Sequence, residues 1–161
     1  MTPSSQRDAG QDPLLMLQTV FARGGFGKGI GTTLGIRGVE AVHGSVTLEG
    51  RPTDDHINPG GTVHGGYLAT LLDGAMALAV QTLFPVGTPY STTTLTVTYV
   101  RPMRPHSTVA RAVAAVTHEG RSLVVAQARV LDEHDVVYAH ATATFHVARD
   151  AGGDSSSRPD G

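Results

Sequence analysis

The longest apolar segment of the chain, HGGYLATLLDGAMALAV at His64–Val80, constrains the fold most. At 100° per residue its larger apolar side chains fall on one stripe of a helix and small residues fall opposite. A helix that is apolar or small on nearly every side is a buried helix. The segment therefore predicts a central buried helix from about Gly66 to Leu83, ended by Pro85. The stripe comprises Leu68, Leu71, Leu72, Ala75, Met76, Ala79 and Leu83, and the small face comprises Thr70, Gly74 and Ala77.

Runs of alternating or β-favouring residues predict strands on both sides of this helix. They are Thr33–Val42, Gly44–Glu49, Ser91–Val100, Val109–Thr117, Ser122–Leu131 and Val136–Val147. Three successive turns at roughly 13–15-residue spacing predict that the last four strands pair as an antiparallel meander. One long helix with antiparallel strands is an α+β layout, and we expect a curved sheet wrapped around the helix. Because edge strands stay unpaired, we also expect a dimer formed through a sheet edge.

The two ends of the chain differ from this core. Asp12–Phe26 predicts an N-terminal helix that Asp12 caps and Pro13 begins. The following glycines, GGFGKGIG, match no phosphate-binding motif and predict a flexible connection. Residues 1–11 are polar and residues 149–161 are rich in Gly, Ser and Asp, so both are predicted to be flexible. The chain is thus expected to form one domain over residues 12–148.

Composition excludes several classes of protein. With 161 residues, 40% hydrophobic, 16% charged and a net charge of −2, the chain suits one soluble domain rather than a nucleic-acid-binding protein. The absence of cysteine excludes disulfides, thiolate metal sites and a cysteine nucleophile. The eight histidines form no metal-binding motif, and no G-x-S-x-G motif is present. The start lacks the order of a signal peptide, and the apolar segment is too interrupted for a membrane span, so we expect a cytoplasmic protein.

Asp73 is the only Asp, Glu, Lys or Arg between Ile57 and Val100. A carboxylate on a buried helix is costly unless it is paired or faces a cleft. Two interpretations follow. Asp73 either caps a loop or meets a distant arginine, or it is a reactive acid at the edge of a pocket, with a tuned pKa.

The glycines at the start of this helix offer a second chemical feature. A helix N-terminus presents unpaired N–H groups, and glycine lets another group approach them closely. A carbonyl oxygen there would be polarised as in an oxyanion hole, although a simple tight turn explains the glycines too. Gly65 and Asp73 are eight residues apart, which is roughly 12 Å along a helix. If both act on one carbonyl carbon, they must come from two subunits of a two-fold dimer.

The segments INPGGTVHGGYLATLLDGAMALA and TTTLTVTYVRPM together resemble the hotdog-fold acyl-CoA thioesterases, in the PaaI-like, phenylacetate-degradation branch. The resemblance covers roughly Gly31–Val147. It implies a hotdog fold and hydrolysis of acyl-CoA without a cofactor. It also implies an active site between two protomers, in a homodimer or in a homotetramer built as a dimer of dimers.

The resemblance also implies roles for individual residues. Asp73 would be the nucleophile or the general base, and the Gly65 N–H would bind the thioester oxygen. Asn58 and His64 match polar residues of the pocket loop, and Thr92 matches a residue that positions water, with Thr93 and Thr94 as alternatives. The residues expected to bind coenzyme A are Gly66, Arg101, Arg121 and Ser122, with Arg104 as a further candidate.

Other functions remain open from the sequence alone. A non-catalytic hotdog module that binds acyl-CoA as a sensor is the main alternative, although a pure binder has no need of a buried acid. Action on acyl-carrier-protein thioesters would require a basic docking patch that the sequence does not show clearly. The acyl group cannot be identified, but the small residues Thr70, Gly74 and Ala77 suggest room for an aromatic or medium-chain group.

Overall fold

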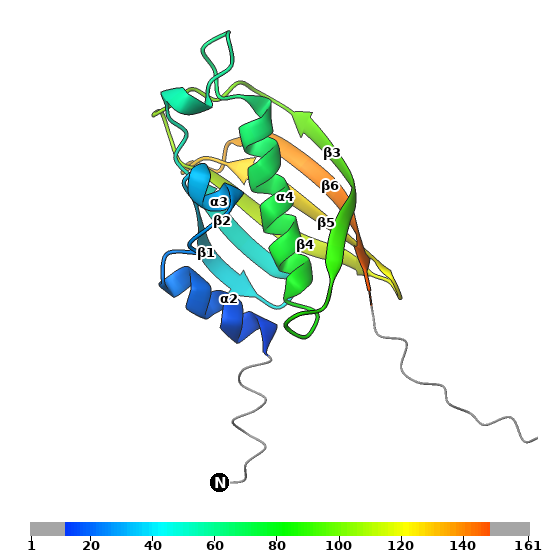
Figure 1. Cartoon of the computed structure of the whole chain (residues 1–161). Helices are drawn as coiled ribbons and strands as arrows, with labels where there is room; N and C mark the ends of the chain where they lie inside the picture. The colour runs from blue at the N-terminus through cyan, green and yellow to red at the C-terminus, as the bar shows by residue number, and fades with distance from the viewer. Residues whose placement is uncertain (1–11, 149–161) are drawn as a thin grey trace, which may run out of the picture.

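The computed structural model describes residues 12–148. Six strands form one curved antiparallel sheet, and the long helix α4 lies across its concave face (Figure 1). The expected α+β layout, a sheet wrapped around a central helix, is therefore confirmed. In chain order the elements are α2 (Pro13–Ala22), α3 (Ile30–Thr33), β1 (Ile36–Val42), β2 (Ser45–Gly50), η1 (Asp54–His56), α4 (Gly65–Gln81), β3 (Tyr90–Tyr99), β4 (Ala110–Glu119), β5 (Leu123–Leu131) and β6 (Val137–Val147).

The strand order in space is β1-β2-β4-β5-β6-β3, so β1 and β3 form the two edges (Figure 1). The predicted meander is correct for β4, β5 and β6. It is wrong for β3, which pairs with β6 and not with β4. The connection after β3 explains the difference, because the loop before α4 holds it: Val63 N–H donates to Met103 C=O at 2.9 Å, and His106 N–H donates to Pro52 C=O at 3.0 Å. These bonds carry the chain across the end of the sheet instead of turning it back.

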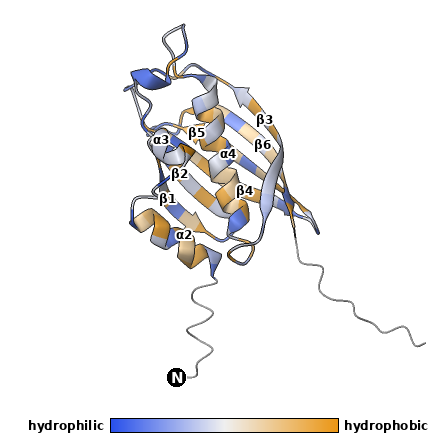
Figure 2. Cartoon of the chain, viewed as in Figure 1, coloured by the Kyte–Doolittle hydropathy of each residue, from blue (hydrophilic) through white to orange (hydrophobic). Residues whose placement is uncertain are grey.

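The predicted apolar stripe of α4 faces the sheet and forms the centre of the core. Leu71, Leu72 and Met76 are fully buried, and Figure 2 shows hydrophobic residues alternating with polar ones along the strands behind the helix. Each such side chain contributes about 1.5–3 kcal/mol through burial. The helix is therefore held by packing, which fixes the direction in which its remaining face points.

Both ends of α4 are capped by side chains. His64 Nδ1 accepts a hydrogen bond from the Gly66 N–H at 2.9 Å. At the other end the Thr82 hydroxyl donates to Ala79 C=O at 2.7 Å and accepts from the Gly44 N–H at 2.7 Å, which ties the helix to the β1–β2 turn. The helix is one residue longer at its start and two residues shorter at its end than predicted.

The N-terminal helix α2 begins as predicted, because Asp12 Oδ1 accepts from the N–H groups of Leu14 and Leu15. It ends at Ala22 rather than Phe26, since Gly24 and Gly25 take positive φ angles of 88° and 114°. The glycine-rich connection leads into the short helix α3, which the sequence did not predict. The expectations for residues 1–11 and 149–161 lie outside the described residues. Among the described residues no helix is both long enough and apolar enough to span a membrane.

Candidate active site

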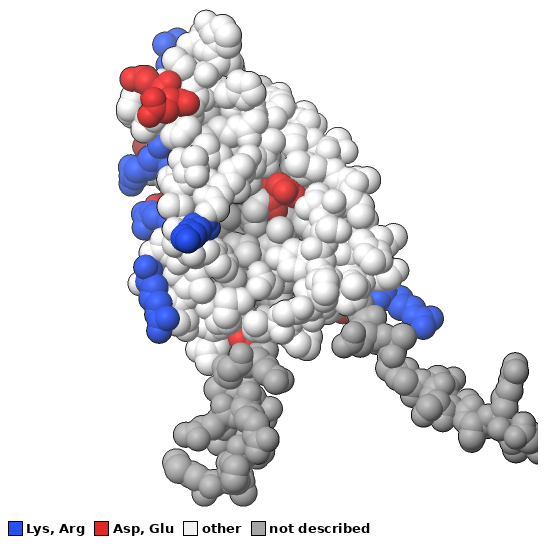
Figure 3. All heavy atoms as spheres, in the orientation of Figure 1, with Lys and Arg blue, Asp and Glu red and all other residues white. Residues whose placement is uncertain are grey.

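Asp73 lies half-buried in the middle of α4 and bonds to the edge strand β3. The Thr92 hydroxyl donates to Asp73 Oδ1 at 3.0 Å. Among residues 12–148 no Lys or Arg forms an ion pair with Asp73, so the interpretation as a partner of a distant arginine fails. Figure 3 shows one group of acidic atoms alone on the uncharged face over α4 and β3, where Asp73 is the only charged residue of either element. The second carboxylate oxygen therefore stays available to a reactant.

Tyr90, at the start of β3, bonds to the last residue of α4 and lies near enough to Asp73 for its charge to be felt. The Tyr90 hydroxyl donates to Gln81 Oε1 at 3.2 Å. Burial, and to a lesser extent the negative charge of Asp73, raise the pKa of Tyr90, so this phenol stays protonated and neutral near neutral pH. The start of β3 and the second half of α4 thus form a polar cluster within an apolar surrounding.

The first turn of α4 has a different set of contacts. Because His64 caps Gly66, the His64 ring is used in building the helix start. The Tyr99 hydroxyl donates to Gly65 C=O at 2.8 Å, and a Cβ added at Gly65 would lie 2.9 Å from Tyr99 Cζ. A larger residue at position 65 would therefore displace the Tyr99 ring from the helix start. No acceptor among the described residues receives the Gly65 N–H, as is usual for the first residue of a helix.

Asn58 uses its side chain to shape the loop before the helix. Its Nδ2 donates to Thr62 Oγ1 at 2.9 Å, and its Oδ1 accepts from the N–H groups of Gly60 at 2.9 Å and Thr62 at 3.3 Å. Asn58, Gly65, Tyr99 and Arg101 line one cavity of about 390 Å³. Residues far apart in the sequence thus meet at the N-terminus of α4.

Comparisons with known proteins agree with this geometry. A family model described as the thioesterase superfamily matches residues 60–139, which hold both Asp73 and the helix start. A protein of Halobacterium salinarum, named as an esterase by inference, is 33% identical over 133 residues, which cover 76% of this chain and 86% of that protein. The chain belongs to the thioesterase superfamily. The expectation that it is an enzyme that hydrolyses thioesters is thereby confirmed.

Solved structures place this thioesterase in the hotdog fold. The Escherichia coli PaaI protein, from the phenylacetic acid degradation operon, superposes with a TM-score of 0.73 over 85% of this chain and 94% of its own, at 20% identity. A Ralstonia eutropha protein, described as a phenylacetic acid degradation-related thioesterase by inference, gives a TM-score of 0.72 at 27% identity, over 84% of this chain and 99% of its own. The predicted PaaI-like resemblance is confirmed.

The residues expected to bind coenzyme A lie at two separate ends of this thioesterase. Arg101 is exposed beside the cavity at Gly65, with its guanidinium carbon 5.9 Å from the centre of the Tyr138 ring. Arg121 and Ser122 lie in the β4–β5 turn, where Ser122 C=O accepts from the Val147 N–H at 2.9 Å. That turn adjoins the end of β6 and the start of β3, whereas Arg101 follows the end of β3. One protomer therefore does not bring these two arginines together.

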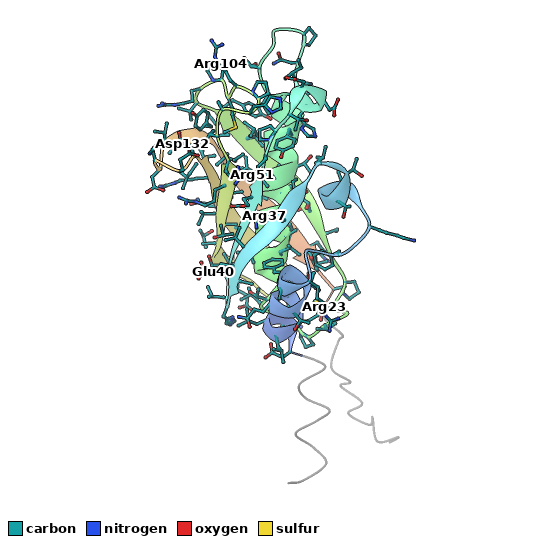
Figure 4. The ribbon with its side chains drawn as sticks, turned by 90° about the vertical axis from the view of Figure 1, so that its left-hand side faces the viewer. Arg23, Arg37, Glu40, Arg51, Arg104 and Asp132 are labelled. Carbon is teal, nitrogen blue, oxygen red and sulfur yellow. The ribbon has the colours of Figure 1, made fainter. Side chains whose placement is uncertain are left out.

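Arg104 is the remaining basic candidate. Figure 4 labels it at the end of the molecule where the connection after β3 runs, away from Arg37 and Arg23. It does not line the cavity at Gly65. Among residues 12–148 no group of three or more His, Asp or Glu side chains could hold a metal ion.

Sequence reasoning missed Tyr99, Tyr90 and Gln81. Strict alternation places Thr92 and Tyr99 on opposite faces of β3, because seven residues separate them. A β-bulge between Thr92 and Thr94 changes this, since Thr92 pairs with Phe145 while Thr94 pairs with Thr144. Both side chains can therefore face α4. The bulge also distinguishes Thr92 from the alternative candidate Thr93. The Thr93 hydroxyl donates to Thr144 C=O at 3.0 Å and not to Asp73.

Proposed function

We propose that this thioesterase hydrolyses acyl-CoA to a free acid and coenzyme A, with Asp73 as the general base or nucleophile. The observation that carries the proposal is the Asp73 carboxylate, held by Thr92 on an otherwise uncharged face. As general base, its free oxygen takes a proton from water as the water attacks the thioester carbonyl. As nucleophile, it attacks that carbon itself and forms an anhydride, which water then opens.

The oxygen of the thioester would bind at the Gly65 N–H of the partner protomer. This N–H lies at the positive end of the α4 dipole, which favours the negative charge that develops on the oxygen. Within one chain Gly65 and Asp73 lie roughly 12 Å apart along the helix, too far to meet one carbonyl group. Asn58 and His64 then act as positioning residues, because they shape the loop and cap the helix that present this N–H.

Strand β3 supplies a way to bring the two halves together. Thr92, bonded to Asp73, lies near its start, and Tyr99, bonded to Gly65, lies at its end. If two copies of β3 pair antiparallel about a two-fold axis, the start of one strand lies beside the end of the other. With Thr92 opposite Tyr99 and Thr93 as the extra residue of the bulge, the axis passes through Thr96. The same pairing moves Arg121 and Ser122 of one protomer toward Gly66 and Arg101 of its partner, where they would bind the nucleotide phosphates.

Coenzyme A as the leaving group is supported by a structure of the same fold. A Streptococcus mutans protein, described as bound to acetyl CoA, gives a TM-score of 0.64 at 24% identity over 70% of this chain and 88% of its own. Cytoplasmic location and a dimer of dimers remain predictions.

A panel of alkyl and aryl CoA esters, assayed by release of free thiol, tests the proposed activity. We expect turnover that depends on Asp73, with oxygen esters of the same acids hydrolysed far more slowly. Binding of the esters without thiol release would instead support a non-catalytic acyl-CoA sensor.

A further inference from the structure

A second cavity lies on the other side of α4 from β3. It has a volume of about 330 Å³, near the lower end of the roughly 300–1,000 Å³ that small-molecule sites occupy. Its inner wall is the small face of α4, at Thr70, Gly74 and Ala77. Its outer wall comes from α2, the glycine-rich connection and α3, at Phe21, Phe26 and Ile30.

The outer wall exposes large apolar side chains. Phe26 is 55% exposed and Ile30 is 63% exposed. The Phe21 ring packs directly against Gly38, where an added Cβ would collide with it. The exposed apolar side chains border a space that an apolar ligand can fill.

Two basic residues line this cavity, and both are exposed to solvent. The Arg37 guanidinium is paired with the carboxylate of Glu49. Lys28 lies on the glycine-rich connection and forms no ion pair with a described residue. The remaining lining is mostly aliphatic, aromatic or glycine, so the interior suits an uncharged group.

The cavity begins next to the proposed reacting centre. Thr70 precedes Asp73 by three residues and Ala77 follows it by four, which places their Cβ atoms about 5–6 Å from that of Asp73. The cavity at Gly65 and Arg101, supplied by the partner, would take the thiol side of the substrate. The 330 Å³ cavity therefore lies where the acyl side of a thioester held at Asp73 would continue.

We infer that this cavity binds the acyl group of the substrate and that the chain is selective for uncharged, apolar acyl groups longer than acetyl. The inference rests on the proposed function. Most of the outer wall, from Phe21 to Gly38, lies outside residues 60–139, the part that matches the family model. The N-terminal segment thus sets the acyl specificity, while the family segment supplies the chemistry.

Binding of S-alkyl coenzyme A thioethers tests this inference without any hydrolysis, because a thioether has no carbonyl group. By calorimetry, the wild-type protein should bind S-octyl-CoA at least about 30-fold more tightly than S-ethyl-CoA, since each buried methylene group adds about fourfold and burial of two to three of the six extra methylenes gives this factor. Ile30→Ser should remove about tenfold of this preference. Ala77→Phe, which fills the cavity from the helix side, should abolish it.

Leu15→Ser is the matched control, because Leu15 is 45% exposed and does not line the cavity. It should keep the octyl preference within twofold of wild type. Equal affinity of the wild-type protein for the two thioethers, or equal effects of Ile30→Ser and Leu15→Ser, would overturn the inference. Failure of the proposed function shows separately, as thiol release that is absent or independent of Asp73.

Discussion

The two edge strands of the sheet differ in how they protect their free backbone groups. β1 has seven residues, carries Arg37 and Glu40, contains a bulge between Gly38 and Glu40, and is covered on one side by α2. Figure 4 shows Arg37 and Glu40 along this side of the molecule. β3 has ten residues without a single charge, and its side chains from Ser91 to Thr96 are exposed.

This difference assigns the two edges different roles. Charges, bulges and covering helices prevent an edge from pairing with another sheet, whereas a long uncharged edge favours pairing. β3 is also the strand that contacts both Asp73 and Gly65. The edge that is open to a second copy is therefore the one that carries both halves of the proposed site, and β1 provides the matched control for each test.

The largest effect is expected at Asp73. Asp73→Asn keeps the shape of the side chain but cannot accept a proton or attack, so kcat should fall about 10³-fold with little change in KM. Glu40→Gln, the same change on the β1 edge, should leave kcat within twofold. Thiol release measures both, and an Asp73→Asn enzyme within tenfold of wild type would refute the assignment.

The next largest effect is expected from a charge on the open edge. In the proposed pairing Leu95 lies one position from the two-fold axis, and the two Leu95 side chains are diagonal neighbours on one face of the sheet, so Leu95→Lys brings two ammonium groups near each other across the interface. Sedimentation should show monomers, and activity should fall about 100-fold because one catalytic group, Gly65 or Asp73, is lost from each site. Val39→Lys on β1 should leave assembly and activity unchanged. A Leu95→Lys protein that stays dimeric would rule out this edge as the interface.

Substitution of Thr92 should lower activity less than Asp73→Asn or Leu95→Lys does. Thr92→Val keeps the volume but removes the hydroxyl that donates to Asp73, and loss of such a bond to a charged group should lower kcat about tenfold. Thr93→Val is the control, because the Thr93 hydroxyl bonds to a backbone carbonyl instead. Equal losses in the two variants would mean that the Thr92 hydroxyl affects kcat through the structure of β3 and not through Asp73.

Substitution of Arg101 or Arg121 should weaken the binding of the CoA ester and leave kcat unchanged. Arg101→Ala and Arg121→Ala should each raise KM for a CoA ester about threefold to tenfold and leave KM for the matching pantetheine thioester unchanged, since only the former carries nucleotide phosphates. Arg51→Ala, near the β1 edge, should change neither value. An equal rise for both substrates would contradict phosphate binding.

Much of the fold was predictable because it depends on local periodicity. The apolar stripe of α4, the strand positions and the cap at Asp12 all follow from residues close in the sequence. The position of β3 was not predictable, since it depends on bonds between the 100–109 connection and the loop before α4. The short helix α3 was missed because its four residues, IGTT, have no periodic pattern.

The site was predictable only in part, for a similar reason. Asp73 and Gly65 could be identified as candidates because a lone acid on a buried helix and a glycine at a helix start each allow a chemical role. Tyr99 could not, since its contact with Gly65 depends on the β-bulge at Thr92–Thr94 and on the place of β3 beside α4.

Mixed dimers test directly whether each active site is shared between two protomers. Asp73→Asn and Gly65→Val should each be inactive alone, the second because its side chain fills the space before the helix N-terminus. Random mixing makes half of the dimers heterodimers, and each of these has one site with both catalytic groups intact. A shared site predicts recovery of about a quarter of the wild-type specific activity. Activity no greater than the sum of the two separate variants would contradict it.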